Sequence, residues 1–450
     1  MIARERRFAA IVFGVYAAIT LAVALHHEPW RDEADPWLLV RDGGISTMLA
    51  RTGYAGMPAL WYLALAPLVK LGLPYVSMTL LNLAFAWAAA LVFLVAAPFP
   101  RYVRALFVFS YFLSYEYAAI ARPYALAVLL LFAALASWRW PMRFALFVAL
   151  LANTTPHMLL IAAILGALYL RERPRRAAIA IMLAGGLLSA VQLLPPRDAP
   201  QGHVLRGASL LPVQEAVATA FFPRTEMQGR SLFAAAIVAA VSLSIGARAT
   251  PQIFLWASLA ALSFIYAFIW MGGARHAGLL LIVVIATLWL AVLDGRLRAE
   301  SELMALLAVP LAISCLLMPR VWLRELREPF SGAAEMASWL ERNGHARARI
   351  AAHAPNRAQA VLPYLDRTFF YPARGRDGSY MTWDAAHKRA QAMDDATAAR
   401  IAREHLRGAS FLLLLNAPLQ NAHGFQLLHA TARPFGHRDE QYFLYAAEGR

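Results

Sequence analysis

The sequence predicts an all-α polytopic membrane protein of about eleven transmembrane helices, followed by a small extracytoplasmic α/β domain. Three observations support this fold class. Of the 450 residues, 60% are hydrophobic and only 15% are charged, whereas soluble domains usually carry about a quarter charged residues. The apolar residues form repeated runs close to the ~20 residues that cross a bilayer as a helix. Residues 321–450 are more polar and contain no such run.

Eleven apolar segments are candidate spans. They are residues 8–25, 76–97, 105–121, 124–138, 142–155, 157–170, 177–194, 231–247, 252–271, 277–293 and 301–318. The first follows a basic start, and the residues after it lack a small-residue cleavage pattern, so we interpret it as an uncleaved signal anchor. A further apolar stretch, 58–73, is interrupted by two prolines and a lysine.

The arginines between these spans predict the orientation, because cytoplasmic loops are enriched in Lys and Arg. With the N-terminus in the cytoplasm, every inner loop carries arginine: Arg101 and Arg104; Arg139 and Arg143; Arg171, Arg173, Arg175 and Arg176; Arg248; Arg296 and Arg298. This holds only if 58–73 does not cross. We therefore expect 58–73 to be an interfacial helix on the outer surface, with Trp61 and Tyr62 at headgroup depth. The net charge of +15 then reflects membrane topology and not a nucleic-acid partner.

This orientation defines two domains. Residues 1–320 form the transmembrane domain, with large outer loops at 26–75 and 195–230, and residues 321–450 form the extracytoplasmic domain. Within the second domain we expect a helix from near Ser331 to before Gly344 and a polar helix at about 385–406. Strands are expected at 347–352, 410–416, 425–430 and 441–446.

The most unusual polar segment runs from Glu28 to Trp37, just outside the first span. Its carboxylates do not serve lipid packing and are mildly unfavourable near an anionic membrane. A glycosyl transfer from a phosphate leaving group needs a base to deprotonate the acceptor. Asp32 and Glu33 are therefore candidate catalytic residues; the alternative is that they cap or solvate an interfacial helix.

Two further outer segments could hold a phosphate. Arg122, followed by Pro123 and Tyr124, offers the planar donor fork that suits a phosphate diester, although an arginine snorkelling to the interface is an alternative. Arg275 and His276 follow a glycine pair and could form a second phosphate contact or merely ordinary loop polarity.

Two more residues complete the candidate set. Glu116 precedes the Arg122 segment and could be an acidic partner, and His157 is either a site residue or a structural hydrogen-bonding group. All these candidates fall on the outer side of the predicted topology. An ion-coupled transporter would instead place its ionisable groups within the spans.

Three segments resemble motifs of the GT-C superfamily, in the branch of the protein O-mannosyltransferases and the aminoarabinose transferase that modifies lipid A. They are Asp32-Glu33, Pro58-Ala59-Leu60-Trp61-Tyr62 and Ala121-Arg122-Pro123-Tyr124-Ala125-Leu126. The resemblance implies an inverting transferase that uses a polyprenyl-phosphate sugar at a site facing away from the cytoplasm. It also implies that Asp32 is the base and that Glu33 positions the acceptor or neighbouring basic groups. By the same resemblance Arg122 lies beside the donor phosphate, and Glu116 supplies a further acid.

Three hypotheses remain open. The first is a transferase that needs no cofactor, although Asp32, Glu33 and Glu116 could bind a divalent ion. The second is a lipid or lipid-sugar carrier without catalysis, and the third is an assembly protein whose C-terminal domain binds partners. The richness in alanine and arginine suggests a GC-rich bacterium, and hence its inner membrane. The sugar, the acceptor and the oligomeric state stay open.

Overall fold

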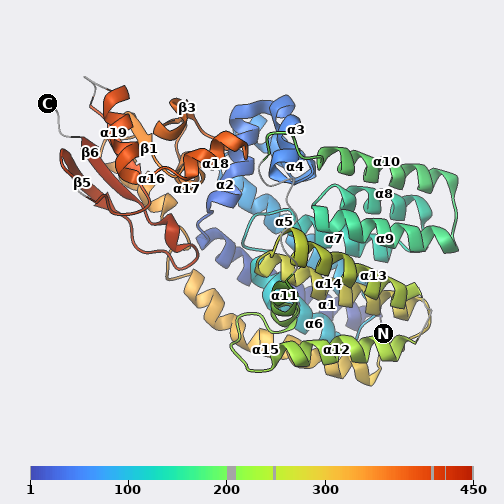
Figure 1. Cartoon of the computed structure of the whole chain (residues 1–450). Helices are drawn as coiled ribbons and strands as arrows, with labels where there is room; N and C mark the ends of the chain where they lie inside the picture. Colours follow the sequence, from blue (N-terminus) through green and yellow to red (C-terminus); the bar gives the residue numbers. More distant parts are fainter. Residues whose placement is uncertain (1, 200–208, 247–249, 407–409, 421, 448–450) are drawn as a thin grey trace.

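The computed structural model describes residues 2–199, 209–246, 250–406, 410–420 and 422–447. A helical part is followed by a smaller domain built on a sheet (Figure 1). This architecture confirms the predicted fold class. Arg248 and residues 200–208 of the predicted loop 195–230 lie outside the described residues.

The helical part runs to residue 325. Its elements are α1 (Ile2–His26), α2 (Arg31–Leu38), η1 (Leu39–Gly43), α3 (Gly44–Ala55), α4 (Leu60–Lys70), α5 (Val76–Ala96), α6 (Arg101–Phe109), η2 (Phe112–Glu116), α7 (Tyr124–Ala136), α8 (Pro141–Ala152), α9 (Pro156–Glu172), α10 (Arg176–Gln192), α11 (Leu211–Phe221), α12 (Arg230–Ile245), α13 (Thr250–Phe264), η3 (Ile265–Ile269), α14 (Ala274–Leu293) and α15 (Glu302–Glu325). The last helix continues beyond the expected domain boundary at residue 320.

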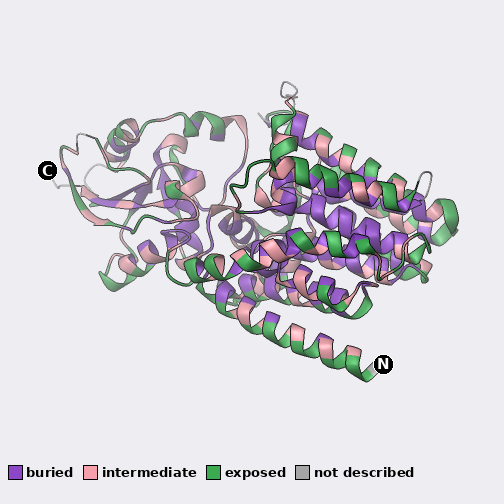
Figure 2. Cartoon of the chain, turned by 90° about the horizontal axis from the view of Figure 1, so that it is seen from below, coloured by how far each residue is buried: buried purple, intermediate pink, exposed green. Residues whose placement is uncertain are grey.

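Several of these helices suit a bilayer, so the chain is a multi-pass membrane protein. Among the described residues, five segments are long and apolar enough to cross by length and composition alone: α1, α5, α13 with η3, α14 and α15. The predicted count of eleven stays a prediction. Helix α14 is the central one, because 83% of its apolar window is buried inside the protein. Figure 2 shows buried residues gathered in the interior of the helical part and exposed ones along its outer helices.

One predicted span, 105–121, is wrong as a continuous helix. Helix α6 ends at Phe109, the short η2 follows, and residues 117–123 are irregular. The side-chain amide of Asn82 on α5 donates to the backbone oxygens of Tyr117, Ala118 and Ile120, at 3.0, 3.0 and 3.3 Å. Irregular backbone at membrane depth is tolerated where it is buried in protein and its polar groups are satisfied. Asn82 therefore stabilises the segment that leads to Arg122.

The stretch 58–73 contains helix α4, whose expected interfacial position stays a prediction, and two aromatic residues of this helix are buried in the protein. Trp61 and Tyr62 are 0% and 2% exposed and pack with Trp37 and Met48 of the preceding segment. These two side chains therefore pack against other protein residues, and their expected headgroup depth stays a prediction. Residues 26–75 form a packed unit of short helices.

The C-terminal domain has a six-stranded sheet in the order β3-β2-β1-β4-β6-β5. The strands are β1 (Ile350–Ala352), β2 (Phe369–Tyr371), β3 (Arg376–Gly378), β4 (Leu412–Leu415), β5 (Phe425–Ala430) and β6 (Phe443–Ala447). Strand β1 pairs in parallel with β2 and β4, and the other pairings are antiparallel. The helices are α16 (Ala333–Arg342), α17 (Pro355–Ala358), α18 (Ala385–Gln391) and α19 (Asp395–His405), and short 3₁₀ turns are η4 (Gln359–Tyr364), η5 (Pro372–Arg374) and η6 (Arg438–Glu440).

Most predicted elements of this domain are present, with one correction. The single helix expected at 385–406 is two helices, because Asp394 caps a new one: its carboxylate accepts from the Thr397 amide at 2.8 Å. Strands β2 and β3 were not predicted.

The two parts of the molecule meet along α2. Ala34 and Leu38 of this helix are fully buried in the same apolar cluster as Met336, Val361 and Leu362 of the C-terminal domain. In Figure 1 the sheet domain lies at the end of the helical part that carries α2, α3 and α4. The polar N-terminal turn of α2 therefore sits at the junction of the two parts.

Candidate functional site

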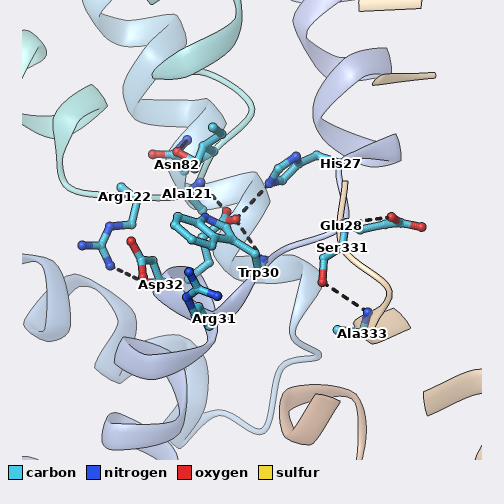
Figure 3. A network of polar contacts seen from close by, with 12 residues as sticks. His27, Glu28, Trp30, Arg31, Asp32, Asn82, Ala121, Arg122, Ser331 and Ala333 are labelled. Atoms are coloured by element: carbon cyan, nitrogen blue, oxygen red, sulfur yellow. Dashed lines mark hydrogen bonds and ion pairs between the residues drawn. The ribbon is translucent and has the colours of Figure 1, made fainter. Parts of the chain in front are cut away.

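The candidate site lies at this junction and is built from four separate segments. They are the start of α2, the turn before α7, the start of α14, and the loop around η6 of the C-terminal domain. Figure 3 shows Trp30, Arg31, Asp32 and Arg122 beside one another, with Ala121 behind them.

Asp32 is the acid that faces the open part of the site. Its side chain is 37% exposed, and its Oδ2 lies 3.6 Å from Nη1 of Arg275, beyond hydrogen-bond distance. Its backbone oxygen accepts from Nη1 of Arg122. The carboxylate therefore keeps its lone pairs available while two guanidinium groups flank it.

Both arginines have unused donors. Nε of Arg122 and Nη1 of Arg275 are buried and have no hydrogen-bond partner within the described protein. Buried donors without partners are rare because they cost free energy. Arg275 is held by a loose ion pair to Oε1 of Glu116 at 3.8 Å and by the ring of Trp30, 5.1 Å away. The two guanidinium groups thus offer unused donors of the kind that bind a phosphate group.

Glu33 is, in contrast, fully buried and fully engaged. Its Oε2 lies 2.9 Å from Nε2 of His27, and its Oε1 accepts from the backbone N–H of Ala121 at 2.6 Å. The other ring nitrogen of His27 lies 2.7 Å from Oε1 of Glu325, whose Oε2 accepts from the Tyr115 hydroxyl at 2.6 Å. Both oxygens of Glu33 are therefore bonded within the protein, one of them to His27, and the implied role of Glu33 stays a prediction.

The charge state of His27 follows from its two partners. Burial lowers the pKa of this imidazole, but the carboxylates of Glu33 and Glu325 outweigh burial and raise the pKa to about 10. The ring therefore carries both protons at neutral pH and donates to both carboxylates. Sequence reasoning missed His27 and Glu325, because a polar residue at the end of an apolar run is ordinarily solvated.

Glu116 is part of a series of polar contacts that extends from the site to a neighbouring cavity. Its Oε2 accepts from the Tyr111 hydroxyl at 2.7 Å, and Nε of Arg224 donates to the same hydroxyl at 3.1 Å. Arg224 lines a cavity of about 600 Å³, together with Tyr111, Arg230 and the residues just before Arg275. The cavity is within the usual size range of small-molecule sites. Arg224 was missed because it lies in a loop without a motif.

Tyr124, His276 and His157 form a row next to Arg275. The backbone N–H of Gly273 donates to Nδ1 of His276 at 2.9 Å, so Nε2 carries the proton and donates to the Tyr124 oxygen at 2.9 Å. Both nitrogens of His276 are therefore engaged within the protein. His157 is buried, its ring lies 5.1 Å from that of His276, and neither of its nitrogens has a hydrogen-bond partner in the described protein. Within the described protein, Tyr124 and His157 are the members of this row that can still form a hydrogen bond to a ligand.

The C-terminal domain contributes a loop to the site, which the sequence did not suggest. The ring of His437 stacks on Trp30 at 3.6 Å and 3°. Nη1 of Arg31 lies 2.8 Å from Oδ2 of Asp439, and the Arg31 backbone N–H donates to Glu440 at 3.1 Å. Burial raises the pKa of Glu440 to about 7, and burial lowers the pKa of His437 to about 4.

A metal site at Asp32, Glu33 and Glu116 stays a prediction. No three His, Cys, Asp or Glu side chains in the described part of the chain come close enough to hold a metal ion.

Asp35, one turn after Asp32, accepts from the Met381 backbone N–H at 3.3 Å, and burial raises its pKa to about 6.

A multi-pass helical part, an acidic pair in the short helix after α1 and a C-terminal sheet domain packed against that helix are together typical of the GT-C fold. Two crystal structures of ArnT from Cupriavidus metallidurans have this fold over 99% of the present chain and 97% of their own. The structure bound to undecaprenyl phosphate has a TM-score of 0.59 at 11% identity, and the apo structure has 0.54 at 12%. No family model matches the sequence, and no curated protein is significantly similar to it. The similarity confirms the GT-C fold that the sequence motifs implied.

Proposed function

We propose that the protein is an inverting glycosyltransferase that moves a sugar from a polyprenyl-phosphate carrier to an acceptor on the outer face of the membrane. The observation that supports this proposal most directly is the arrangement of Asp32, Arg122 and Arg275. A half-exposed carboxylate with free lone pairs lies between two guanidinium groups with free donors. A base next to a phosphate-binding wall is what such a transfer requires.

In the proposed reaction Asp32 accepts the proton of an acceptor hydroxyl or amine. The acceptor oxygen or nitrogen then forms a bond to the anomeric carbon, and the bond from that carbon to the phosphate oxygen breaks. The released phosphate keeps the electron pair, and Arg122 and Arg275 stabilise its charge. One displacement inverts the configuration, and the proton stays on Asp32 until water removes it.

The cavity next to Arg275 suits the carrier lipid in this proposal. Tyr111 lines it and connects it to Glu116 through a hydrogen bond, and Arg224 and Arg230 are the cations on its wall. Leu210, Leu211 and Met271 are exposed around it, as expected of a surface that meets an isoprenoid chain. The structural neighbour that carries undecaprenyl phosphate supports the same class of donor.

The orientation and the membrane are also part of the proposal. Arginine placement favours a cytoplasmic N-terminus and an extracytoplasmic C-terminal domain, in a bacterial inner membrane.

The test is Asp32→Asn, with Asp294→Asn as its matched control. Asp294 has nearly the same side-chain exposure, 38%, and an arginine partner at 3.4 Å, but it lies at the opposite end of α14. Each purified protein is placed in vesicles with lipid-linked sugars extracted from the host, and release of undecaprenyl phosphate is measured. We expect Asp32→Asn to slow release about 10²- to 10⁴-fold and Asp294→Asn to leave it unchanged.

Undiminished release by Asp32→Asn would remove this residue from the role of base. A wild-type protein that moves lipid-linked sugar between leaflets without releasing undecaprenyl phosphate would be a carrier. Removing residues 326–450 tests the hypothesis of an assembly protein, because it removes the loop that contacts Trp30 and Arg31. If this loop belongs to the transfer site, transfer stops, and this is the result that we expect. If the C-terminal domain only binds partners, transfer continues.

A further inference from the structure

We infer that His27 and Glu325 are positioning residues of the transfer site, acting through Glu33 to hold the Arg122 turn at a fixed place beside Asp32. This inference rests on the proposed function for its consequence in lipid binding. Its structural basis is the buried series of contacts from Tyr115 through Glu325 and His27 to Glu33. Neither His27 nor Glu325 contacts the open part of the site.

The series connects residues at the ends of three helices. His27 directly follows α1, Glu325 is the last residue of α15, and Glu33 lies in the first turn of α2. The imidazole has nitrogens on opposite sides of a rigid ring, and each is within 2.9 Å of a different carboxylate. One planar side chain therefore fixes the ends of two long helices relative to the helix that carries Asp32. Figure 3 shows His27 directed from its helix toward the centre of this group.

The series reaches the proposed reactive groups through Glu33. Glu33 is the neighbour of Asp32, and its second oxygen accepts from the N–H of Ala121, the neighbour of Arg122. Nη1 of Arg122 in turn donates to the backbone oxygen of Asp32. These two hydrogen bonds and the intervening peptide bonds form a closed ring of contacts. Moving Glu33 would therefore displace the proposed base and the proposed phosphate ligand together.

The ionisable side chains of this series are buried behind the site. His27, Glu33 and Glu325 have side chains with 0% exposure, and a buried ion group is seldom a net source of stability compared with apolar side chains of similar volume. Its directional hydrogen bonds do fix geometry. Since all three groups lie directly behind the site, precise placement is the benefit that the arrangement offers.

The first experiment measures the Arg122 turn without any ligand. Hydrogen–deuterium exchange is followed in the peptide that covers residues 118–124, because the Ala121 amide is bonded only through Glu33. We expect faster exchange in His27→Phe and in the milder His27→Gln, which can donate to one carboxylate but not to both in the same geometry. His26→Phe is the matched control, since His26 is exposed and bonds only to its own helix.

A conservative variant separates geometry from charge. In Glu33→Gln the amide oxygen can accept from Ala121, and the amide nitrogen can donate to a neutral His27 whose other nitrogen still donates to Glu325. We therefore expect near wild-type exchange for Glu33→Gln. Exchange that is unchanged in a folded His27→Gln protein, or equally fast in Glu33→Gln and His27→Gln, would overturn the inference.

The second experiment uses undecaprenyl phosphate as the probe and measures its dissociation constant for the purified full-length protein. His27→Gln and Arg122→Ala should each weaken binding about tenfold or more, since misplacing a ligand-holding group by about 1 Å can have effects of up to 10²-fold. The double variant should bind no more weakly than Arg122→Ala alone. Additive losses would show that His27 does not act through Arg122. A wild-type protein that fails to bind undecaprenyl phosphate, with the exchange result intact, would count against the proposed function and not against the positioning role.

Discussion

Asp32 and Glu33 are consecutive acids on one helix, yet their surroundings differ completely. Glu33 is fully buried and its oxygens have three partners, whereas Asp32 is 37% exposed and its carboxylate makes only one loose ion pair. Consecutive residues of a helix do not face the same way, so one acid points to the core and the other to the open site. Two adjacent acids of one motif can therefore have different roles, one in the structure and the other in the proposed chemistry.

The largest expected effect tests this division directly. In Glu33→Ala, His27 and the Ala121 N–H lose a buried partner, so we expect the free energy of unfolding to fall by about 3–5 kcal/mol. Asp32→Ala should change it by only about 0.5 kcal/mol while abolishing transfer. Denaturant titration in detergent measures the first quantity, and release of undecaprenyl phosphate measures the second. Equal destabilisation by the two variants would end the distinction.

The second prediction concerns Glu440, the buried acid that the C-terminal domain places on the start of α2. Its pKa rises from 4.5 in an unfolded chain to about 7, so between these values the folded state binds more protons. The unfolding free energy therefore decreases as pH rises through this window. The shift corresponds to about 1.4 kcal/mol per pKa unit. From pH 5 to pH 7 the unfolding free energy of Glu440→Gln should therefore rise by at most about 3 kcal/mol relative to that of wild type.

At each pH the unfolding free energy of wild type is subtracted from that of Glu440→Gln. Asp35 and His437 titrate in both proteins, so their contributions cancel in this difference. The measurement is unfolding at pH 5, 6, 7 and 8. A difference that stays constant over this range, or that changes in the opposite direction, would contradict the prediction.

The third prediction tests the loop around η6. His437→Ala removes the ring stacked on Trp30, which should cost about 1 kcal/mol of stability. Because Trp30 also holds Arg275, transfer should slow about tenfold. His405→Ala is the matched control, since His405 stacks on Phe370 at 4.4 Å and 11° elsewhere in the same domain. Equal transfer rates for the two variants would remove the loop from the site.

The smallest expected effect concerns the cavity beside Arg275. Arg224→Lys keeps the charge but loses the guanidinium fork, so undecaprenyl phosphate should bind a few-fold more weakly, a loss of about 1 kcal/mol. Arg230→Lys serves as the comparison, because Arg230 lines the same cavity but is paired with Glu215. Calorimetric titration distinguishes them; if Arg230→Lys is the weaker binder, the assignment of Arg224 is wrong.

The sequence predicted the helical class and the C-terminal sheet domain, and it grouped Asp32, Arg122 and Arg275, which lie close together in the structure. These inferences depend on local patterns, namely apolar runs and the polar residues that end them. The break before Arg122 could not be predicted, because Asn82 stabilises it from a helix some 35 residues earlier. His27 and Glu325 escaped for the same reason, since their pairing spans 298 residues.

The loop at His437 to Glu440 was also beyond local reasoning. Its contacts to Arg31 cross about 400 residues of sequence, and short polar loops carry no periodicity that identifies a partner. The roles assigned to the site residues stay predictions until the variants are measured.

The cap that Glu440 places on the start of α2 has a consequence for biosynthesis. Arg31 is synthesised early in translation, whereas Glu440 and His437 are synthesised more than 400 residues later. Until the ribosome has passed residue 440, the first turn of α2 has no acidic partner and Trp30 has no stacked ring. A nascent chain would therefore hold an incomplete candidate site, which is completed only when the C-terminal domain packs onto the segment that follows the first helix.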